Sequence, residues 1–131
     1  MTEIKFRAWD PERKKYYNVT GLHFFEGDDL SSISIDTDEG EVIDICRSLL
    51  GIEQYTGLKD KNGVEMYEGD IVYIDDYYNM IIVFENGGFL FSNISSSRNL
   101  KGALVGPYFE YLTVIGNVHE NPELLELEND K

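Results

Sequence analysis

Short runs of β-branched and aromatic residues recur along most of this chain, and clusters of Gly, Asn and Asp separate them. Four of these runs are "IEQYTGL", "GDIVYI", "NMIIVFE" and "GFLFS", with turn residues between them at 60–63, 75–76 and 86–88. Strands spaced by about ten residues are typical of antiparallel sheets, whereas parallel strands need long crossover connections. The pattern predicts a mainly β fold, a small barrel or a sandwich-like arrangement of short antiparallel strands, with one or two short helices.

The N-terminal part carries further strand patterns. In "EIKFRAWD", Ile4, Phe6 and Ala8 alternate with Lys, Arg and Trp, which predicts a strand with these three residues on its buried face. The run "KKYYNVTGLHFFE" predicts a second strand that turns at Thr20-Gly21. The run "SSISID" predicts a short alternating strand after it.

Helical spacing interrupts this rhythm in residues 38–50. Apolar residues recur there every three to four positions, Asp38 is a candidate N-cap, and Gly51 is a stop signal, so we expect a helix. Near the C-terminus, we expect Pro107 to open a helical turn and "TVIGNV" to form the last strand. The pair Asn121-Pro122 predicts a short terminal helix, which runs into an acidic tail over about residues 124–131.

The segment "QYTGLKDKNGVEMYEGDIV", residues 54–72, contains the densest turn chemistry in the chain. A two-residue turn at Asn62-Gly63 would place Asp60 opposite Glu65, and this like-charge pair would be unfavourable. A type I turn over 60–63, with Gly63 in the left-handed bulge position, instead pairs Lys59 with Glu65 and Leu58 with Met66. We therefore predict a hairpin with Gly63 at positive φ. The glycines do not precede a Lys-Ser or Lys-Thr at a helix start, which disfavours a phosphate-binding loop.

Charge is distributed unevenly along the 131 residues. The net charge is −14, and residues 26–76 carry fifteen acids and three bases, whereas residues 1–25 carry three acids and five bases. A negative field repels phosphate backbones, so we expect no direct nucleic-acid binding. The chain has neither an apolar run of membrane-spanning length nor a signal-peptide pattern, so we expect one cytoplasmic domain over residues 1–131 and no membrane association.

Few residues of the chain are candidates for catalysis or for metal binding. His23 and His119 are far apart in sequence, and neither has an acid or a second histidine at a metal-ligand spacing. Cys46 lies among aliphatic residues, so we interpret it as a buried structural thiol. The serines lack a Gly-x-Ser-x-Gly motif. We assign no catalytic, cofactor-binding or metal-ligating residue.

Carboxylates are the strongest remaining candidates for chemistry. Four of them stand at the two ends of one short predicted strand: Glu68, Asp70, Asp75 and Asp76. Four strand residues rise about 13 Å, at roughly 3.3 Å each, which separates the two pairs too far for one cation. We therefore interpret them as turn and surface residues, with a carboxylate-dependent, metal-assisted hydrolase as an alternative.

The same 54–72 segment resembles the signature of the YopX family of bacteriophage and prophage proteins, in which Gln, Tyr or Phe, Thr, Gly and Leu precede an Asp and further glycine-containing turns. The runs "IKFRAWD" and "YLTVIGNVHENPELL" are similar to the family's opening and closing segments. Val64 and Met66 stand where Lys and Ile are more usual. The resemblance implies a mainly β protein of phage or prophage origin that acts inside a bacterial cell, and it implies no activity, cofactor or catalytic residue.

Taken together, these features favour a non-enzymatic module that binds a protein or associates with itself. Its candidate contact residues are a tyrosine cluster and the neighbouring acids: Tyr73, Tyr77, Tyr78, Asp75 and Asp76. A second alternative is an acidic DNA mimic, whose carboxylates would occupy the nucleic-acid groove of a host protein.

Overall fold

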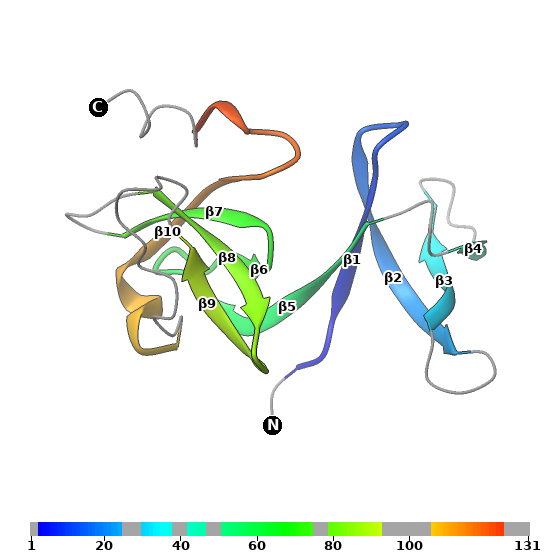
Figure 1. Ribbon diagram of the computed structural model, residues 1–131, viewed down its shortest axis with the longest axis horizontal. Coiled ribbons are helices and arrows are strands. Elements are labelled where there is room, and N and C mark those ends of the chain that lie inside the picture. The colour runs from blue at the N-terminus through cyan, green and yellow to red at the C-terminus, as the bar shows by residue number, and fades with distance from the viewer. Residues whose placement is uncertain are drawn as a thin grey trace. The chain divides into compact units, whose positions relative to one another are not determined.

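The computed structural model describes residues 3–24, 30–37, 42–46, 51–74, 79–92 and 106–124. Its strands form two sheets, in the orders β4-β3-β2-β1-β5-β6 and β10-β7-β8-β9, and every strand pairing in the described residues is antiparallel (Figure 1). The elements are β1 (Phe6–Asp10), β2 (Lys15–Phe24), β3 (Leu30–Asp36), β4 (Val42–Cys46), β5 (Gly51–Lys59), β6 (Glu65–Tyr67), β7 (Asp70–Ile74), β8 (Asn79–Glu85), β9 (Gly88–Ser92), the 3₁₀ helix η2 (Gly106–Tyr111) and β10 (Leu112–Asn117). The prediction of a mainly β, sandwich-like fold is confirmed, and the sheets do not close into a barrel.

The chain divides into two compact units at the middle of β5. Unit 1 extends from Glu3 to Gln54 and unit 2 from Tyr55 to Lys131. The first residues of β5 pair with β1 in unit 1, and its last residues pair with β6 in unit 2. A single cooperative domain over residues 1–131 remains a prediction.

Unit 1 is a sheet of β1 to β4 and the start of β5, with a small apolar cluster. Ala8, Ile33 and Ile35 are fully buried, and four partly buried side chains pack against them: Tyr17, Val19, Leu22 and Ile52. Ile33 and Ile35 lie on the same face of β3, and Ser34 between them is also buried.

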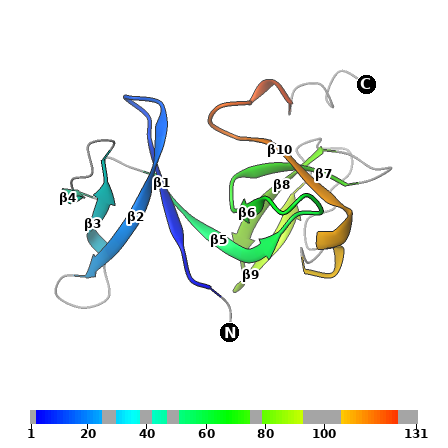
Figure 2. The same cartoon turned by 180° about the vertical axis from the view of Figure 1, so that it is seen from behind.

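Unit 2 packs the β5–β6 hairpin against the four-stranded sheet. Its core consists of Met66, Val72, Met80, Ile82, Phe91 and Leu112, with Leu58, Ile74, Phe89 and Val114 packed around them. β7, β8 and β9 are consecutive antiparallel strands that form a meander (Figure 2). The turn between β8 and β9 places both Asn86 and Gly87 at positive φ, as a type I′ hairpin requires.

Three expectations for the N-terminal part were wrong. Ile4 precedes β1 and is 76% exposed, whereas Trp9, expected on the outer face, is buried. Buried residues therefore occur on both faces of this strand. β2 does not turn at Thr20-Gly21, because the strand is continuous and absorbs the irregularity as a bulge between Val19 and Gly21.

The helix expected over residues 38–50 is also wrong where the structure describes the chain. Residues 42–46 form β4, which pairs with β3 along its whole length. Val42, Ile43 and Ile45 are β-branched, and such side chains are restricted in a helix but pack well on a sheet. Residues 38–41 and 47–50 lie outside the described part of the chain.

The expected helical turn at Pro107 is confirmed as η2, and residues 123–124 are helical after Pro122. The rest of the predicted terminal helix and the acidic tail lie outside the described residues. None of the helical segments in the described ranges has the length and apolar content that a membrane crossing requires.

Candidate functional site

Asp60 organises the turn at the centre of the 54–72 segment. Its Oδ1 accepts hydrogen bonds from the amides of Asn62, at 2.8 Å, and Val64, at 2.9 Å. The amide of Gly63 donates to the carbonyl oxygen of Asp60 at 3.0 Å, and Gly63 has a φ of +84°. The predicted turn geometry and the positive φ of Gly63 are therefore confirmed.

The predicted pairing of Lys59 with Glu65 directly after this turn is confirmed. Lys59 lies opposite Glu65, so unlike charges pair across the hairpin. Leu58 packs against the core cluster that contains Met66, which places both side chains on the inner face. A bulge that includes Gly57, with a φ of +87°, interrupts the pairing further along β5.

Asp60 also binds a strand that is distant in sequence. Its Oδ2 accepts a hydrogen bond from the amide of Val114 in β10 at 2.9 Å. The amide of Lys61 donates to the carbonyl oxygen of Leu112 at 3.1 Å. The turn therefore attaches the β5–β6 hairpin to the outer edge of β10.

The Asp60 carboxylate is held in its charged form. Burial alone would raise the pKa of Asp60, because a low-dielectric environment disfavours the charged form. The amides of Val114, Val64 and Asn62 outweigh that effect, and the pKa of Asp60 is lower than its ordinary value. We conclude that this carboxylate is a structural hydrogen-bond acceptor.

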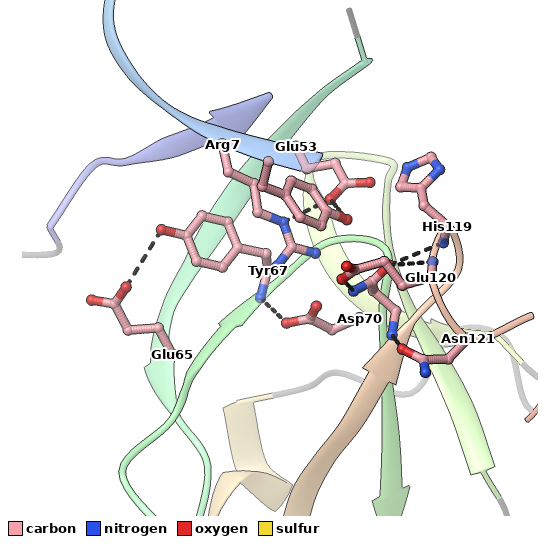
Figure 3. A network of polar contacts seen from close by, with 10 residues as sticks. Arg7, Glu53, Glu65, Tyr67, Asp70, His119, Glu120 and Asn121 are labelled. Atoms are coloured by element: carbon pink, nitrogen blue, oxygen red, sulfur yellow. Dashed lines mark hydrogen bonds and ion pairs between the residues drawn. The ribbon is translucent and has the colours of Figure 1, made fainter. Parts of the chain in front are cut away.

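Asp70 has a comparable structural role in the second turn of the segment. It is buried, and its Oδ2 accepts a hydrogen bond from the amide of Tyr67 at 2.8 Å (Figure 3). Gly69 lies at a φ of +87°, donates to the carbonyl oxygen of Ile82 at 2.8 Å, and accepts from the amide of Val118 at 2.9 Å. This turn is therefore fixed to two other parts of unit 2.

A compact turn follows β10. The side-chain oxygen of Asn117 accepts hydrogen bonds from the amides of His119, at 3.0 Å, and Glu120, at 2.9 Å, and its Nδ2 donates to Glu120 Oε1 at 2.7 Å (Figure 3). Asn121 packs over Gly116, where a Cβ atom added to the glycine would lie 2.5 Å from the Asn121 side chain. The turn therefore directs residues 118–124 back over the sheet.

The described residues contain no group of three or more His, Cys, Asp or Glu side chains that could hold a metal ion. Asp70 is engaged by a backbone amide, and Asp75 and Asp76 lie outside the described residues. The hydrolase alternative therefore gains no support from the geometry of Glu68 and Asp70.

The remaining sequence candidates lie apart from one another. His23 is exposed on β2, and its Nε2 lies 2.7 Å from Ser34 Oγ on β3. His119 is in the turn after β10. Cys46 is in β4, and its side chain is not described, so its interpretation as a buried thiol remains a prediction.

Unit 1 contains a partly buried ion pair that was not predicted from the sequence. Arg7 Nε donates to Glu53 Oε1 at 2.7 Å, and the Tyr16 hydroxyl donates to the same oxygen at 3.0 Å. The Arg7 guanidinium also lies over the Tyr16 ring, 4.2 Å from its centroid. Arg7 and Glu53 are opposite each other in β1 and β5. Only the strand register brings them together, so the sequence contained no local signal for the pair.

An exposed, partly aromatic surface lies on the outer face of β10 and β7, and we call it the tyrosine face. Leu112 and Val114 pack into the core, and the residues that alternate with them point away from it. The tyrosine face consists of Tyr73, Tyr111, Thr113 and Ile115. Thr113 and Tyr73 are direct cross-strand partners, and Tyr111, Tyr73 and Ile115 are 53%, 39% and 37% exposed.

The tyrosine face contains one of the five contact residues proposed from sequence. Tyr73 is exposed on β7, whereas Asp75, Asp76, Tyr77 and Tyr78 lie outside the described residues. Sequence analysis missed Tyr111 and Ile115 as members of the same surface. The signal for them was present, because they alternate with Leu112 and Val114 in the run "YLTVI".

Comparisons with known proteins agree with the sequence resemblance. A family profile described as YopX protein matches residues 5–126. A solved structure of protein EF1440 from Enterococcus faecalis is 32% identical with a TM-score of 0.65, and the match covers 95% of this chain and 99% of that chain. Protein yopX from Bacillus subtilis is 24% identical with a TM-score of 0.60, with the same coverage of both chains, and this likeness shows the fold alone. The comparison with curated proteins found no match.

The profile match spans most of the chain, and the structural match to EF1440 covers nearly all of both proteins. The turn residues of the 54–72 segment have defined structural roles in the fold, in agreement with their place in the family signature. The chain therefore belongs to the YopX protein family.

Proposed function

We propose that this chain is a non-enzymatic protein-binding module whose contact surface is the tyrosine face. The observation that carries the proposal is the exposure of Tyr73 on β7, of Ile115 on β10 and of Tyr111 directly before β10, in a sheet whose other side is a packed core. Tyrosine is enriched at protein interfaces, because it combines a large apolar ring with a hydroxyl group that tolerates solvent.

The rigidity of the strands supports this assignment. Tyr73 and Thr113 are direct partners in the part of the β7–β10 ladder that precedes the bulge between Val114 and Gly116. Asp60 also holds the free edge of β10 through the amide of Val114. A preorganised surface loses little conformational entropy when it binds, so more of the contact energy contributes to affinity. The proposal includes a phage or prophage origin and a location inside a bacterial cell, which the family resemblance supports.

Affinity purification from the bacterial host with quantitative mass spectrometry tests the proposal. We expect a Tyr73→Ala/Tyr111→Ala double variant to lose at least tenfold of a partner that the unmodified protein retains. The matched control is Phe24→Ala, which removes an aromatic side chain that is 59% exposed in unit 1. Equal retention by the double variant and the unmodified protein, with both folded by circular dichroism, would contradict the proposal.

A divalent-ion assay addresses the hydrolase alternative. A cation that binds only the native state would raise the melting temperature beyond that of a sodium control at equal ionic strength. We expect no such difference with millimolar magnesium, calcium or manganese. A large divalent-specific increase would favour the hydrolase instead.

A further inference from the structure

We infer that the tyrosine face binds a cationic segment of another protein and that it does not bind a second copy of this chain. This inference rests on the proposed function and adds the chemistry of the partner. It follows from the charges around the face, from the course of residues 118–124, and from cation–π contacts that the protein already contains.

The sheet that carries the tyrosine face has no basic residue. Residues 62–97 include β7, β8 and β9 and contain six acids but no Lys or Arg. Residues 106–124 include β10 and contain three acids and again no Lys or Arg. Lys61 of the β5–β6 hairpin contacts this sheet through its amide, which donates to the carbonyl oxygen of Leu112, and Lys59 lies opposite Glu65 in the same hairpin. The strands that carry the face therefore have a net negative charge.

Two exposed carboxylates belong to segments that adjoin the tyrosine face. Glu110 directly precedes Tyr111 at the end of η2. Glu123 lies in the segment that passes from Asn121, over Gly116 in β10, to Leu124, whose carbonyl oxygen accepts a hydrogen bond from Asn79 Nδ2 in β8 at 3.3 Å.

Because β7 lies between β10 and β8, this segment crosses the outer face of β7 beside Tyr73. Ile71 faces outward at this crossing, opposite Gly116, and is fully buried. The segment therefore forms one border of the tyrosine face, and it includes the exposed Glu123.

An aromatic surface bordered by carboxylates matches Lys and Arg side chains. Their cationic groups are attracted to aromatic rings and to carboxylates, and their aliphatic stems cover apolar surface. Unit 1 uses this chemistry twice, because Arg7 lies over Tyr16 at 4.2 Å and Lys15 lies over Tyr17 at 5.0 Å from the ring centroids.

The same negative charges disfavour the binding of a second copy of this chain to the tyrosine face. In a two-fold dimer through this face, each acidic border would meet the acidic border of the partner. Each chain carries a net charge of −14, so long-range repulsion would also slow the encounter. With a cationic partner, the contact at the acidic border becomes attractive and the encounter becomes faster.

Fluorescence anisotropy with labelled synthetic peptides tests the inference. The probe is a peptide of about twelve residues in which Lys and Arg alternate with Leu and Tyr, and two matched peptides carry Gln or Glu in place of the bases. We expect the cationic peptide to bind at least tenfold more tightly than the Gln peptide. We also expect the affinity of the cationic peptide to fall at least tenfold between 0.05 and 0.5 M NaCl, because salt screens exposed charges. The Tyr73→Ala/Tyr111→Ala variant should likewise bind this peptide at least tenfold more weakly.

Paired charge variants separate local recognition from the overall field. Glu110→Gln/Glu123→Gln and Glu3→Gln/Glu12→Gln change the net charge equally, but the first pair lies in segments that adjoin the tyrosine face, whereas the second pair belongs to unit 1. We expect the first pair to weaken cationic-peptide binding at least fivefold and the second pair less than twofold. Equal losses would overturn the inference, as would an absence of cationic-peptide binding.

Further outcomes distinguish this inference from the proposed function. Equally tight binding of the Gln and cationic peptides, with loss in the tyrosine variant, would overturn the inference and leave the proposed function intact. Dimerisation in sedimentation experiments that the tyrosine variant abolishes would identify a second copy as the occupant and overturn the inference. Peptide binding that the tyrosine variant does not change would overturn both, provided that thermal melts show the variant to be folded.

Discussion

Two hairpin turns in this protein begin with a buried aspartate, and they differ in what the second carboxylate oxygen binds. In unit 1, Asp10 Oδ1 accepts the amides of Glu12, at 2.9 Å, and Arg13, at 3.2 Å, while Oδ2 lies 3.2 Å from the guanidinium of Arg13. In unit 2, Asp60 Oδ1 likewise accepts two turn amides, but Oδ2 accepts the amide of Val114, which is 54 residues away.

The difference shows that one local motif can have two structural roles. Every partner of Asp10 described above is within four residues, and the Arg13 side chain is 69% exposed. Asp60 stabilises its own turn and also holds a distant strand. We therefore expect substitutions at Asp60 to affect the tertiary structure of unit 2, and substitutions at Asp10 to act locally.

The largest expected effect is that of Asp60→Asn. The two Asp60 oxygens accept three backbone amides, so an asparagine must place its NH₂ group against at least one N–H donor. We expect a loss of about 3 kcal/mol in the free energy of unfolding, since hydrogen bonds to charged groups contribute about 1.5–3 kcal/mol each.

The matched control is Asp10→Asn, which can keep both turn amides on one oxygen. It loses mainly an ion pair with an exposed arginine, and solvent screening makes such a pair contribute little to stability. Urea denaturation at pH 7 measures both values. If both variants lost the same free energy of unfolding, the proposed difference between the tertiary role of Asp60 and the local role of Asp10 would be wrong.

The pH dependence of stability is the second test. Burial would raise the pKa of Asp10, as it would for Asp60, but the amides of Arg13 and Glu12 outweigh it and the pKa is lowered. A carboxyl group with a lowered folded pKa stabilises the fold fully above its unfolded pKa, near 3.9, and this contribution is lost as the pH falls through the folded pKa.

We therefore expect the difference in unfolding free energy between the unmodified protein and Asp60→Asn to be constant from about pH 5 to 7 and to shrink below about pH 4. Chemical denaturation across this range measures it. A difference that stays constant down to the acid transition would mean that the Asp60 carboxylate is not preferentially ionised in the fold.

The smallest expected effects concern the left-handed residue of each turn. Gly63 occupies this position in unit 2 at φ +84°, and Lys14 occupies it in unit 1 at φ +57°. Gly63→Ala meets open space but a strained backbone, so we expect it to destabilise by about 1 kcal/mol. Lys14→Gly relieves such strain and should stabilise by about 0.5 kcal/mol. Thermal melts should show a lower melting temperature for Gly63→Ala and a higher one for Lys14→Gly. Changes in the same direction would contradict the role of backbone strain at these two positions.

The Asp60 turn shows what the sequence could predict and where prediction stopped. Its register depends on neighbours within a few residues, so the pairing of Lys59 with Glu65 and the conformation of Gly63 followed from local charge and turn preferences. The hydrogen bond to Val114 depends on where β10 lies, and no local pattern contains that information. The same limit applies to the pair between Arg7 and Glu53.

The errors have a related cause. The apolar residues of 42–46 fit helical spacing as well as a strand, and only pairing with β3 decided between them. For the candidate site, sequence analysis found Tyr73 but missed Tyr111 and Ile115. The helical turn at Pro107 was predicted correctly, but Tyr111 is its last residue, and its place beside β10 depends on where the turn ends, which no local pattern specified.

The attachment of the Asp60 turn to β10 also limits how this protein can aggregate. The backbone groups of an edge strand are a template for strand addition, which underlies runaway sheet growth. Here the carbonyl oxygen of Leu112 and the amide of Val114 already bind Lys61 and Asp60. Another chain therefore cannot extend the sheet at this edge without displacing the turn. Weakening the turn should make the protein prone to fibril formation before it abolishes folding, and the protecting group would be a single carboxylate.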